Sequence, residues 1–115
     1  MRSSHAARLA SRFDDSQAGA LRALVNNAAI QINAPVETLP LDQWRKQFEV
    51  NLFGHIAVTQ ALLPALLRDS GRVVNISSVG GRIAMPTYGP YAGTKFALEA
   101  VSDSLRRARN CSIPR

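Results

Sequence analysis

The feature that most restricts the fold of this chain is a long helical pattern set between two short apolar runs. Across residues 41–67 large apolar side chains recur at helical spacing, namely Leu41, Trp44, Phe48, Leu52, Ile56, Leu62 and Leu66. The runs at residues 21–26 and 72–76 are short and mostly apolar, as buried strands are. Two strands joined through a helix form a βαβ unit with a parallel strand pair. The pattern therefore predicts an α/β fold.

Two residues are expected to disturb the long helix. Gly54 and Pro64 both lie inside the pattern at residues 41–67. Proline lacks the N–H that an α-helix needs, and its ring clashes with the preceding turn. We expect Pro64 to kink or locally unpair the helix near Thr59 and Gln60.

The other segments are assigned from periodicity and from turn-forming residues. Helical spacing is seen over residues 4–13 and again from about 90 to 107. Prolines and glycines predict loops over residues 31–40 and 80–89. The loop at residues 80–89 is expected to be flexible. The chain shows no internal repeat, and its 115 residues suffice for one modest domain. We predict a single partial domain over residues 1–115.

Composition argues against several classes of protein. A hydrophobic content of 46% is typical of a globular chain. The net charge is +6, but the arginines are scattered and no aromatic residues lie between them, so nucleic-acid binding is not expected. The single Cys111 cannot form an internal disulfide. No zinc-ligand spacing is present, so we expect no metal.

Neither a membrane span nor export is expected from the sequence. No apolar stretch approaches the roughly 18 residues that a spanning helix needs, and the hydrophobic region of a secretory signal is missing. Residues 1–8 are basic and contain serine, which fits either a transit peptide or a helix of the domain. We predict a cytoplasmic protein.

Tyr91 and Lys95 are the candidate reactive pair. Because they are four residues apart, they lie on one face of the predicted helix. A neighbouring cation favours the phenolate and makes a tyrosine more acidic, which suits proton transfer near neutral pH. A helix-surface pair without function has the same spacing. Tyr88 is not a candidate, because Ala92 stands four residues after it.

Three further motifs precede this pair. They are the run Asn26-Asn27-Ala28-Ala29, Asn51 inside the long helix, and Ser78 at the end of the second strand-like run, thirteen residues before Tyr91. In this order and spacing they resemble the short-chain dehydrogenase/reductase family, whose signature is Asn-Asn-Ala-Gly, a helix Asn, a Ser and a Tyr-x-x-x-Lys. The resemblance covers residues 21–107, with Ala29 where the family usually has glycine. Residues 108–115 form an atypical tail.

The resemblance implies both a fold and a reaction. The fold is a Rossmann-type, doubly wound parallel sheet, of which this chain would carry about two strands with long flanking helices. The reaction is an NAD(P)-dependent interconversion of a small secondary alcohol and a carbonyl. Tyr91 would be the general acid or base, and Lys95 would make it more acidic and bind the nicotinamide ribose. Ile83 and Met85, in the preceding loop, favour an apolar substrate.

The resemblance also gives roles to four other residues. Ser78 would hydrogen-bond the substrate oxygen. Asn51 would hold a water that links Lys95 to solvent, in the helix irregularity that an inward Asn tends to create. Asn26 would brace the neighbouring strands and, with Ala28, contact the adenosine side of the cofactor. Each residue has an ordinary alternative: Ser78 as a strand-end cap, Asn51 as a polar residue on a helix flank, and Asn26 as part of a turn.

Two parts of the family pattern are missing from the sequence. The stretch before Leu24 has one glycine, Gly19, and no Gly-x-x-x-Gly-x-Gly turn to hold the cofactor pyrophosphate. The residue that would distinguish the two nicotinamide cofactors is missing too, so the cofactor is NAD or NADP. The alternative function is therefore a truncated, non-catalytic remnant that acts through self-association or partner binding.

The resemblance finally implies a homo-oligomer. In the family the long helix and the Tyr-bearing helix commonly pack across a two-fold axis, and both are present here. A sheet of two parallel strands would also have an unpaired edge, which favours association. We expect self-association through these two helices.

Overall fold

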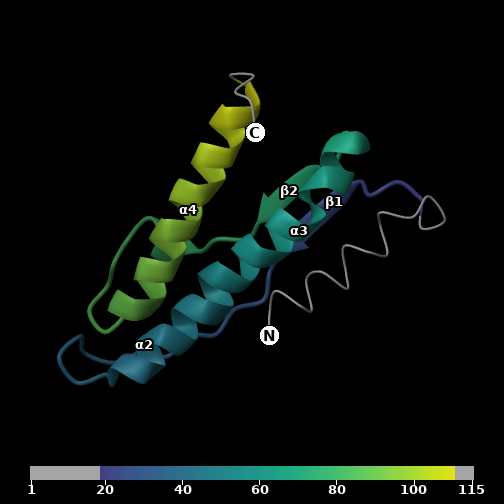
Figure 1. Cartoon of the computed structure of the whole chain (residues 1–115). Helices are drawn as coiled ribbons and strands as arrows, with labels where there is room; N and C mark the ends of the chain where they lie inside the picture. The colour runs from purple at the N-terminus through teal and green to yellow at the C-terminus, as the bar shows by residue number, and fades with distance from the viewer. Residues whose placement is uncertain (1–18, 111–115) are drawn as a thin grey trace. The chain divides into compact units, whose positions relative to one another are not determined.

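The computed structural model describes residues 19–110 (Figure 1). In chain order the elements are β1 (Ala23–Asn26), α2 (Leu41–Phe48), the π-helix η2 (Glu49–Phe53), α3 (Gly54–Arg68), β2 (Arg72–Asn75), the 3-10 helix η3 (Val79–Gly81) and α4 (Gly89–Asn110). They belong to two compact units. Unit 1 comprises Met1–Ala28 and Phe53–Ile76, and unit 2 comprises Ala29–Leu52 and Ser77–Arg115.

Unit 1 contains the sheet. β1 pairs with β2 in parallel, with Ala23 opposite Arg72 and Asn26 opposite Asn75. The helix α3 comes between the two strands in sequence and packs against β1 (Figure 1). Parallel strands need a crossover connection, and the long helix supplies most of it. The structure thus confirms the predicted βαβ unit and the α/β class.

The two faces of this sheet differ in exposure. Side chains alternate between the faces along a strand. Leu24 is half-buried and Asn26 is buried on the face toward α3, whereas Val25 and its partner Val74 are 57% and 41% exposed on the other. Parallel strands are usually covered on both faces. Among the described residues, unit 1 therefore has a sheet with one covered face and the open edges predicted for two strands.

The turn between α3 and β2 leaves room only for glycine. A Cβ added at Gly71 would lie 2.6 Å from the carbonyl oxygen of Leu21 and 2.7 Å from Cδ2 of Leu66. The backbone N–H of Leu21 donates to Oδ2 of Asp69 at 2.8 Å. Hydrogen bonds from Arg68 and then from Leu21 hold the pKa of the Asp69 carboxyl below its usual value. These contacts tie the residues just before β1 to the turn just before β2.

The long helix is continuous but not uniform. α2, η2 and α3 follow one another over Leu41–Arg68, as the apolar spacing predicted. The helix is irregular at the π turn around Asn51. Such turns are rare and frequently lie at functional sites. Pro64 lies inside α3, which continues through it to Arg68, so the kink or local unpairing expected near Thr59 and Gln60 does not end the helix. Because proline has no backbone N–H, Pro64 removes one hydrogen bond from α3, and the neighbouring turns remain helical.

The same helix corrects the expectation that no segment could span a membrane. By length and composition alone, Leu41–Arg68 is long and apolar enough to do so. The core helix of a soluble protein passes the same test, so the finding is weak evidence for a span. Gln47, Asn51 and His55 are buried polar residues within it. Such side chains are expensive in lipid unless they find polar partners.

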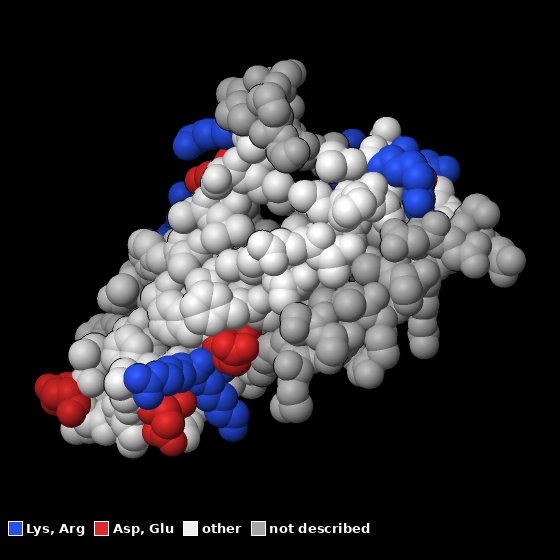
Figure 2. All heavy atoms as spheres, in the orientation of Figure 1, with Lys and Arg blue, Asp and Glu red and all other residues white. Residues whose placement is uncertain are grey.

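Unit 2 is built from α2, η3 and α4. α4 contacts both of the other elements, and its side chains Ala92 and Leu98 are each only 1% exposed. A Cβ added at Gly93 would lie 3.3 Å from Cζ of Phe48, so this glycine lets α2 and α4 approach closely. Where α2 lies in Figure 2, basic and acidic side chains stand together. The surface of α2 is therefore mixed in charge rather than uniformly basic.

Three predicted segments differ from the structure or lie outside it. The loop predicted over residues 80–89 is ordered at its start, where η3 forms a short 3-10 helix. α4 continues to Asn110 rather than ending at Arg107, so residues 108–110 of the predicted tail are helical. The helix predicted over residues 4–13 lies outside the described residues.

Candidate active site

Four of the predicted site residues belong to unit 2. Asn51 lies in η2, Ser78 immediately precedes η3, and Tyr91 and Lys95 lie on α4. The predicted contacts of the adenosine side, Asn26 and Ala28, belong to unit 1. All four candidate catalytic residues therefore belong to one compact unit.

Tyr91 and Lys95 lie on one face of α4, as their spacing predicted. Nζ of Lys95 lies 5.8 Å from the centroid of the Tyr91 ring, within the range of a cation–π contact. The Lys95 side chain is only 2% exposed, whereas Tyr91 is half-buried. Burial lowers the pKa of the Lys95 ammonium, because desolvation disfavours its charged form. The pair therefore combines a desolvated cation with a partly accessible phenol.

Replacing Lys95 by methionine should stabilise the fold near neutral pH. Because burial lowers the pKa of Lys95 in the folded state below its ordinary value of 10.5, the unfolded chain binds more protons between these two pKa values. Stability of the native chain therefore rises with pH across that window and is lowest below the folded pKa. Urea unfolding of wild type and Lys95→Met should differ most near neutral pH, with the gap shrinking as the pH approaches about 10.

The control for this comparison is Lys46→Met, since Lys46 is exposed on α2. Lys46→Met should leave the free energy of unfolding within about 0.5 kcal/mol of the wild type at every pH. A stability gap between wild type and Lys95→Met that stays constant with pH would contradict the argument, because desolvation of a charge must vanish as the charge does.

Ser78 lies in a turn that contacts Tyr91. Its hydroxyl oxygen accepts a hydrogen bond from the N–H of Gly80 at 3.1 Å and caps η3, so the capping alternative is seen in the structure. Since this bond uses a lone pair, the hydroxyl hydrogen remains available to donate. A Cβ added at Gly80 would lie 3.1 Å from Cε2 of Tyr91. The glycine thus brings the turn that begins at Ser78 against the tyrosine ring.

Ser77, the neighbour that the spacing to Tyr91 disfavours, is placed differently. Its hydroxyl is buried and has no hydrogen-bond partner in the part of the chain that the structure describes. A Cβ added at Gly81 would lie 2.4 Å from this oxygen. Ser77 therefore faces the packed interior of the turn.

The side chain of Asn51 makes three hydrogen bonds. It is fully buried, and its Oδ1 accepts from the N–H of Ile30 at 2.8 Å. Its Nδ2 donates to the carbonyl of Ile30 at 2.8 Å and to Oγ1 of Thr94 at 3.2 Å. Both amide hydrogens are used. A water bound by Asn51 would therefore donate to an oxygen of this residue, because neither amide hydrogen is free to bind it.

A polar stripe that the sequence analysis missed continues from Asn51 toward the start of the helix. Gln47, one helical turn earlier, is also fully buried. Its Oε1 accepts from the N–H of Ile32 and its Nε2 donates to the carbonyl of Ile32, both at 3.2 Å. In unit 2, therefore, Gln47 binds the peptide groups of Ile32, and Asn51, four residues later on the helix, binds those of Ile30. In the sequence, the position of Gln47 four residues before Asn51 could have indicated that both lie on the same buried face of the helix.

Unit 1 contains the same kind of contact. Nε2 of His55, a buried residue, lies 2.7 Å from the carbonyl oxygen of Ala28. Asn26 donates through Nδ2 to Oγ1 of Thr59 at 3.1 Å and to Oδ1 of Asn75 on the neighbouring strand at 2.8 Å. Asn26 thus makes the cross-strand bond that bracing requires. Its side chain also links β1 to α3.

Metal ligands do not gather within the described range of 19–110. No group of three or more His, Cys, Asp or Glu side chains in it is placed to hold an ion. The candidate site residues carry a phenol, an ammonium, a hydroxyl and a carboxamide.

Comparison with known proteins gives a consistent family. The family model for short chain dehydrogenase matches residues 1–110. The chain is 48% identical over 85 residues to dehydrogenase/reductase SDR family member 9 of Homo sapiens, covering 73% of this chain and 26% of that protein. It is 49% identical over 83 residues to the mitochondrial D-beta-hydroxybutyrate dehydrogenase of Mus musculus, covering 72% and 24%.

Solved structures give the same result. A short-chain dehydrogenase from Streptomyces avermitilis superposes with a TM-score of 0.81 at 36% identity, covering 90% of this chain and 38% of that one. A gluconate 5-dehydrogenase from Burkholderia cenocepacia, solved with NADP and tartrate, has a TM-score of 0.78 at 34% identity, covering 91% and 42%. The chain spans about a quarter of the length of the curated relatives given above.

Proposed function

The chain belongs to the short-chain dehydrogenase family and has its Rossmann fold, and from this premise we propose that it serves an NAD(P)-dependent interconversion of a secondary alcohol and a carbonyl. The observation that carries the proposal is the placement of the buried Lys95 ammonium 5.8 Å from the Tyr91 ring. In the same unit, Gly80 brings the Ser78 turn against that ring. In the proposed reaction these residues would offer one substrate oxygen an acid, a nearby cation and a hydrogen-bond donor.

Tyr91 would transfer the proton. During carbonyl reduction its hydroxyl gives a proton to the substrate oxygen as negative charge develops there, and during alcohol oxidation the phenolate takes the proton back. The Lys95 ammonium stabilises the phenolate that remains after the transfer. The nicotinamide cofactor, when bound, supplies or accepts the hydride.

Ser78 would hold the substrate oxygen. Because its own oxygen accepts from Gly80, its hydroxyl hydrogen can point at the substrate. A donor already oriented in this way stabilises the oxyanion without reorganising during the reaction. Asn51 would hold a bound water through one of its oxygens, since its amide hydrogens are used by Ile30 and Thr94.

The cofactor would be NAD or NADP. Lys95 and Tyr91 would bind its nicotinamide ribose, and Asn26 and Ala28 would lie on its adenosine side. The residues fit the ribose end, because an ammonium and a phenol on one helical face can donate to neighbouring ribose hydroxyls. The relative from Burkholderia cenocepacia was solved with NADP, which supports a nicotinamide cofactor for this chain without choosing between the two.

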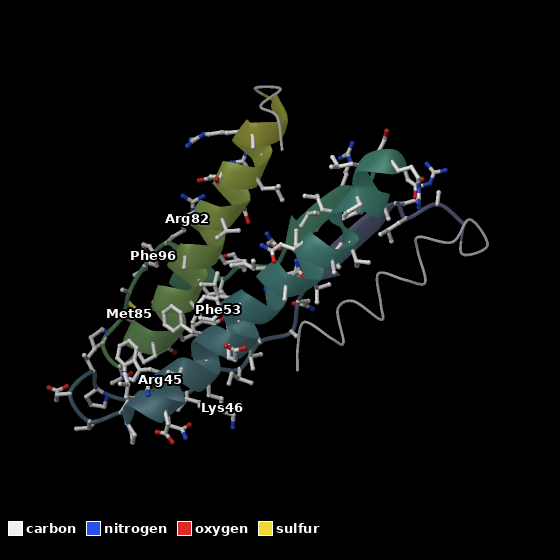
Figure 3. All side chains as sticks on the ribbon, in the orientation of Figure 1. Arg45, Lys46, Phe53, Arg82, Met85 and Phe96 are labelled. Carbon is white, nitrogen blue, oxygen red and sulfur yellow. The ribbon has the colours of Figure 1, made fainter. Side chains whose placement is uncertain are left out.

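The substrate would be a small molecule with an apolar part, and the protein would self-associate. Ile83 and Met85 are 52% and 54% exposed in the loop before α4, which supports apolar contacts with a substrate. Phe53 and Phe96 are 50% and 45% exposed on the long helix and on α4 (Figure 3). Large exposed aromatic residues favour an interface on each of these helices. A cytoplasmic location stays a prediction.

A fluorescence titration with NADH and NADPH tests the proposal. The purified chain should bind at least one of them saturably, and Lys95→Ala should weaken binding about tenfold or more, because a charge-assisted hydrogen bond is worth roughly 1.5–3 kcal/mol. Lys46→Ala, on an exposed position, is the matched control. If the folded chain shows no binding at millimolar cofactor, the alternative holds: a non-catalytic chain that acts through self-association or partner binding.

A further inference from the structure

Thr94 lies between the two members of the reactive pair. It is fully buried on α4, one residue before Lys95. Its hydroxyl donates to the carbonyl oxygen of Tyr91 at 2.6 Å. A hydroxyl has a single hydrogen, so toward Nδ2 of Asn51, at 3.2 Å, its oxygen must accept. Thr94 therefore joins the π turn to the turn of α4 that carries the reactive pair.

The hydrogen bonds through Thr94 run in one direction. The N–H of Ile30 donates to Oδ1 of Asn51, the Asn51 amide donates to Thr94, and Thr94 donates to the carbonyl of Tyr91. Successive bonds of this kind polarise one another inside a protein. Each member is buried or half-buried, so no water competes freely for its place.

We propose that Thr94 is a positioning residue, whose hydroxyl orients the Asn51 side chain and through it holds the segment at Ile30. The inference rests on the proposed function in one respect, because it is the reaction that requires Asn51, Tyr91 and Lys95 to be aligned. An apolar residue of the same shape would fill the space at Thr94. It would leave a buried amide hydrogen of Asn51 without an acceptor, and Asn51 would lose its fixed orientation.

Amide hydrogen exchange at Ile30, measured by NMR, tests this role at a distance from the substitution. Thr94→Val keeps the shape and removes the hydroxyl, whereas Thr94→Ser keeps the hydroxyl. The internal reference is the N–H of Ile32, which Gln47 holds without help from Thr94. Thr94→Val should speed exchange at Ile30 about tenfold relative to Ile32, and Thr94→Ser should leave this ratio within about twofold of the wild type.

Three results would overturn the proposal. Exchange at Ile30 and Ile32 could rise equally, which would mean a general loss of stability. The ratio could stay unchanged in Thr94→Val, or Thr94→Ser could behave as Thr94→Val does. If Thr94→Val does not fold, Thr94→Cys takes its place, because a thiol is only a weak donor and acceptor. The measurement needs no cofactor, so its outcome is independent of whether the chain binds NADH or NADPH.

Discussion

Tyr91→Phe should lower the rate of alcohol–carbonyl interconversion about a thousandfold, because positioned acid–base catalysis typically contributes 10²–10⁴. The substitution removes one oxygen and keeps the ring. The ring packs against Gly80, so the turn at Ser78 should keep its place. The loss should therefore fall on the turnover number rather than on the Michaelis constant of the substrate. Steady-state assays with NADH and NADPH and a panel of apolar ketones would measure it.

Tyr88→Phe is the matched control for this prediction. Tyr88 is the other tyrosine of the chain and directly precedes α4, where its carbonyl accepts from the N–H of Ala92. Its phenol has no place in the proposed reaction, so turnover should stay within about twofold of the wild type. Equal activity of wild type and Tyr91→Phe would remove Tyr91 from the reaction and would point to another acid.

The largest loss of stability is expected for Asn51→Leu. The substitution removes the bonds from Asn51 to the N–H and the carbonyl of Ile30 and to Thr94, all of them made inside the protein. Each buried group left without a partner costs roughly 1–3 kcal/mol. We expect the free energy of unfolding to fall by about 3 kcal/mol or more, measured by urea denaturation.

Asn33→Leu separates this effect from the general cost of losing an asparagine. Asn33 is exposed and bonds only the nearby side chain of Gln31 among the contacts described. Its replacement should change the free energy of unfolding by about 0.5 kcal/mol or less. If both leucine variants unfold at the same urea concentration, apolar packing rather than hydrogen bonding holds the π turn.

The architecture could be predicted because its signals are local. The spacing of apolar residues gave the long helix almost to its last residue, and two apolar runs gave β1 and β2. The kink or local unpairing expected at Pro64 does not interrupt the helix, which continues to Arg68. The last three residues of α4, after Arg107, were missed because Ala108, Arg109 and Asn110 show no apolar periodicity.

The site was predictable as a set of residues but not as a set of contacts. The spacing of Tyr91 and Lys95 places them on one helical face whatever the rest of the fold does. The contact of Gly80 with Tyr91 depends on how η3 packs on α4, which no spacing encodes. Gln47 was missed because helical periodicity is carried by apolar residues, and the peptide group that its carboxamide binds is visible only in the fold.

The polar stripe has a consequence for insertions and deletions in related chains. Four residues of helix rise about 6.0 Å, and two residues of extended chain cover about 6.6 Å, so Gln47 and Asn51 can each meet a peptide group, at Ile32 and Ile30. The bonds involve main-chain atoms, which every residue except proline can offer. Side chains at positions 30 and 32 are thus free to diverge, whereas adding or removing one residue between them, or between 47 and 51, would break the match. We therefore expect related chains to differ in the residues at positions 30 and 32 but to keep the number of residues between these positions and between 47 and 51.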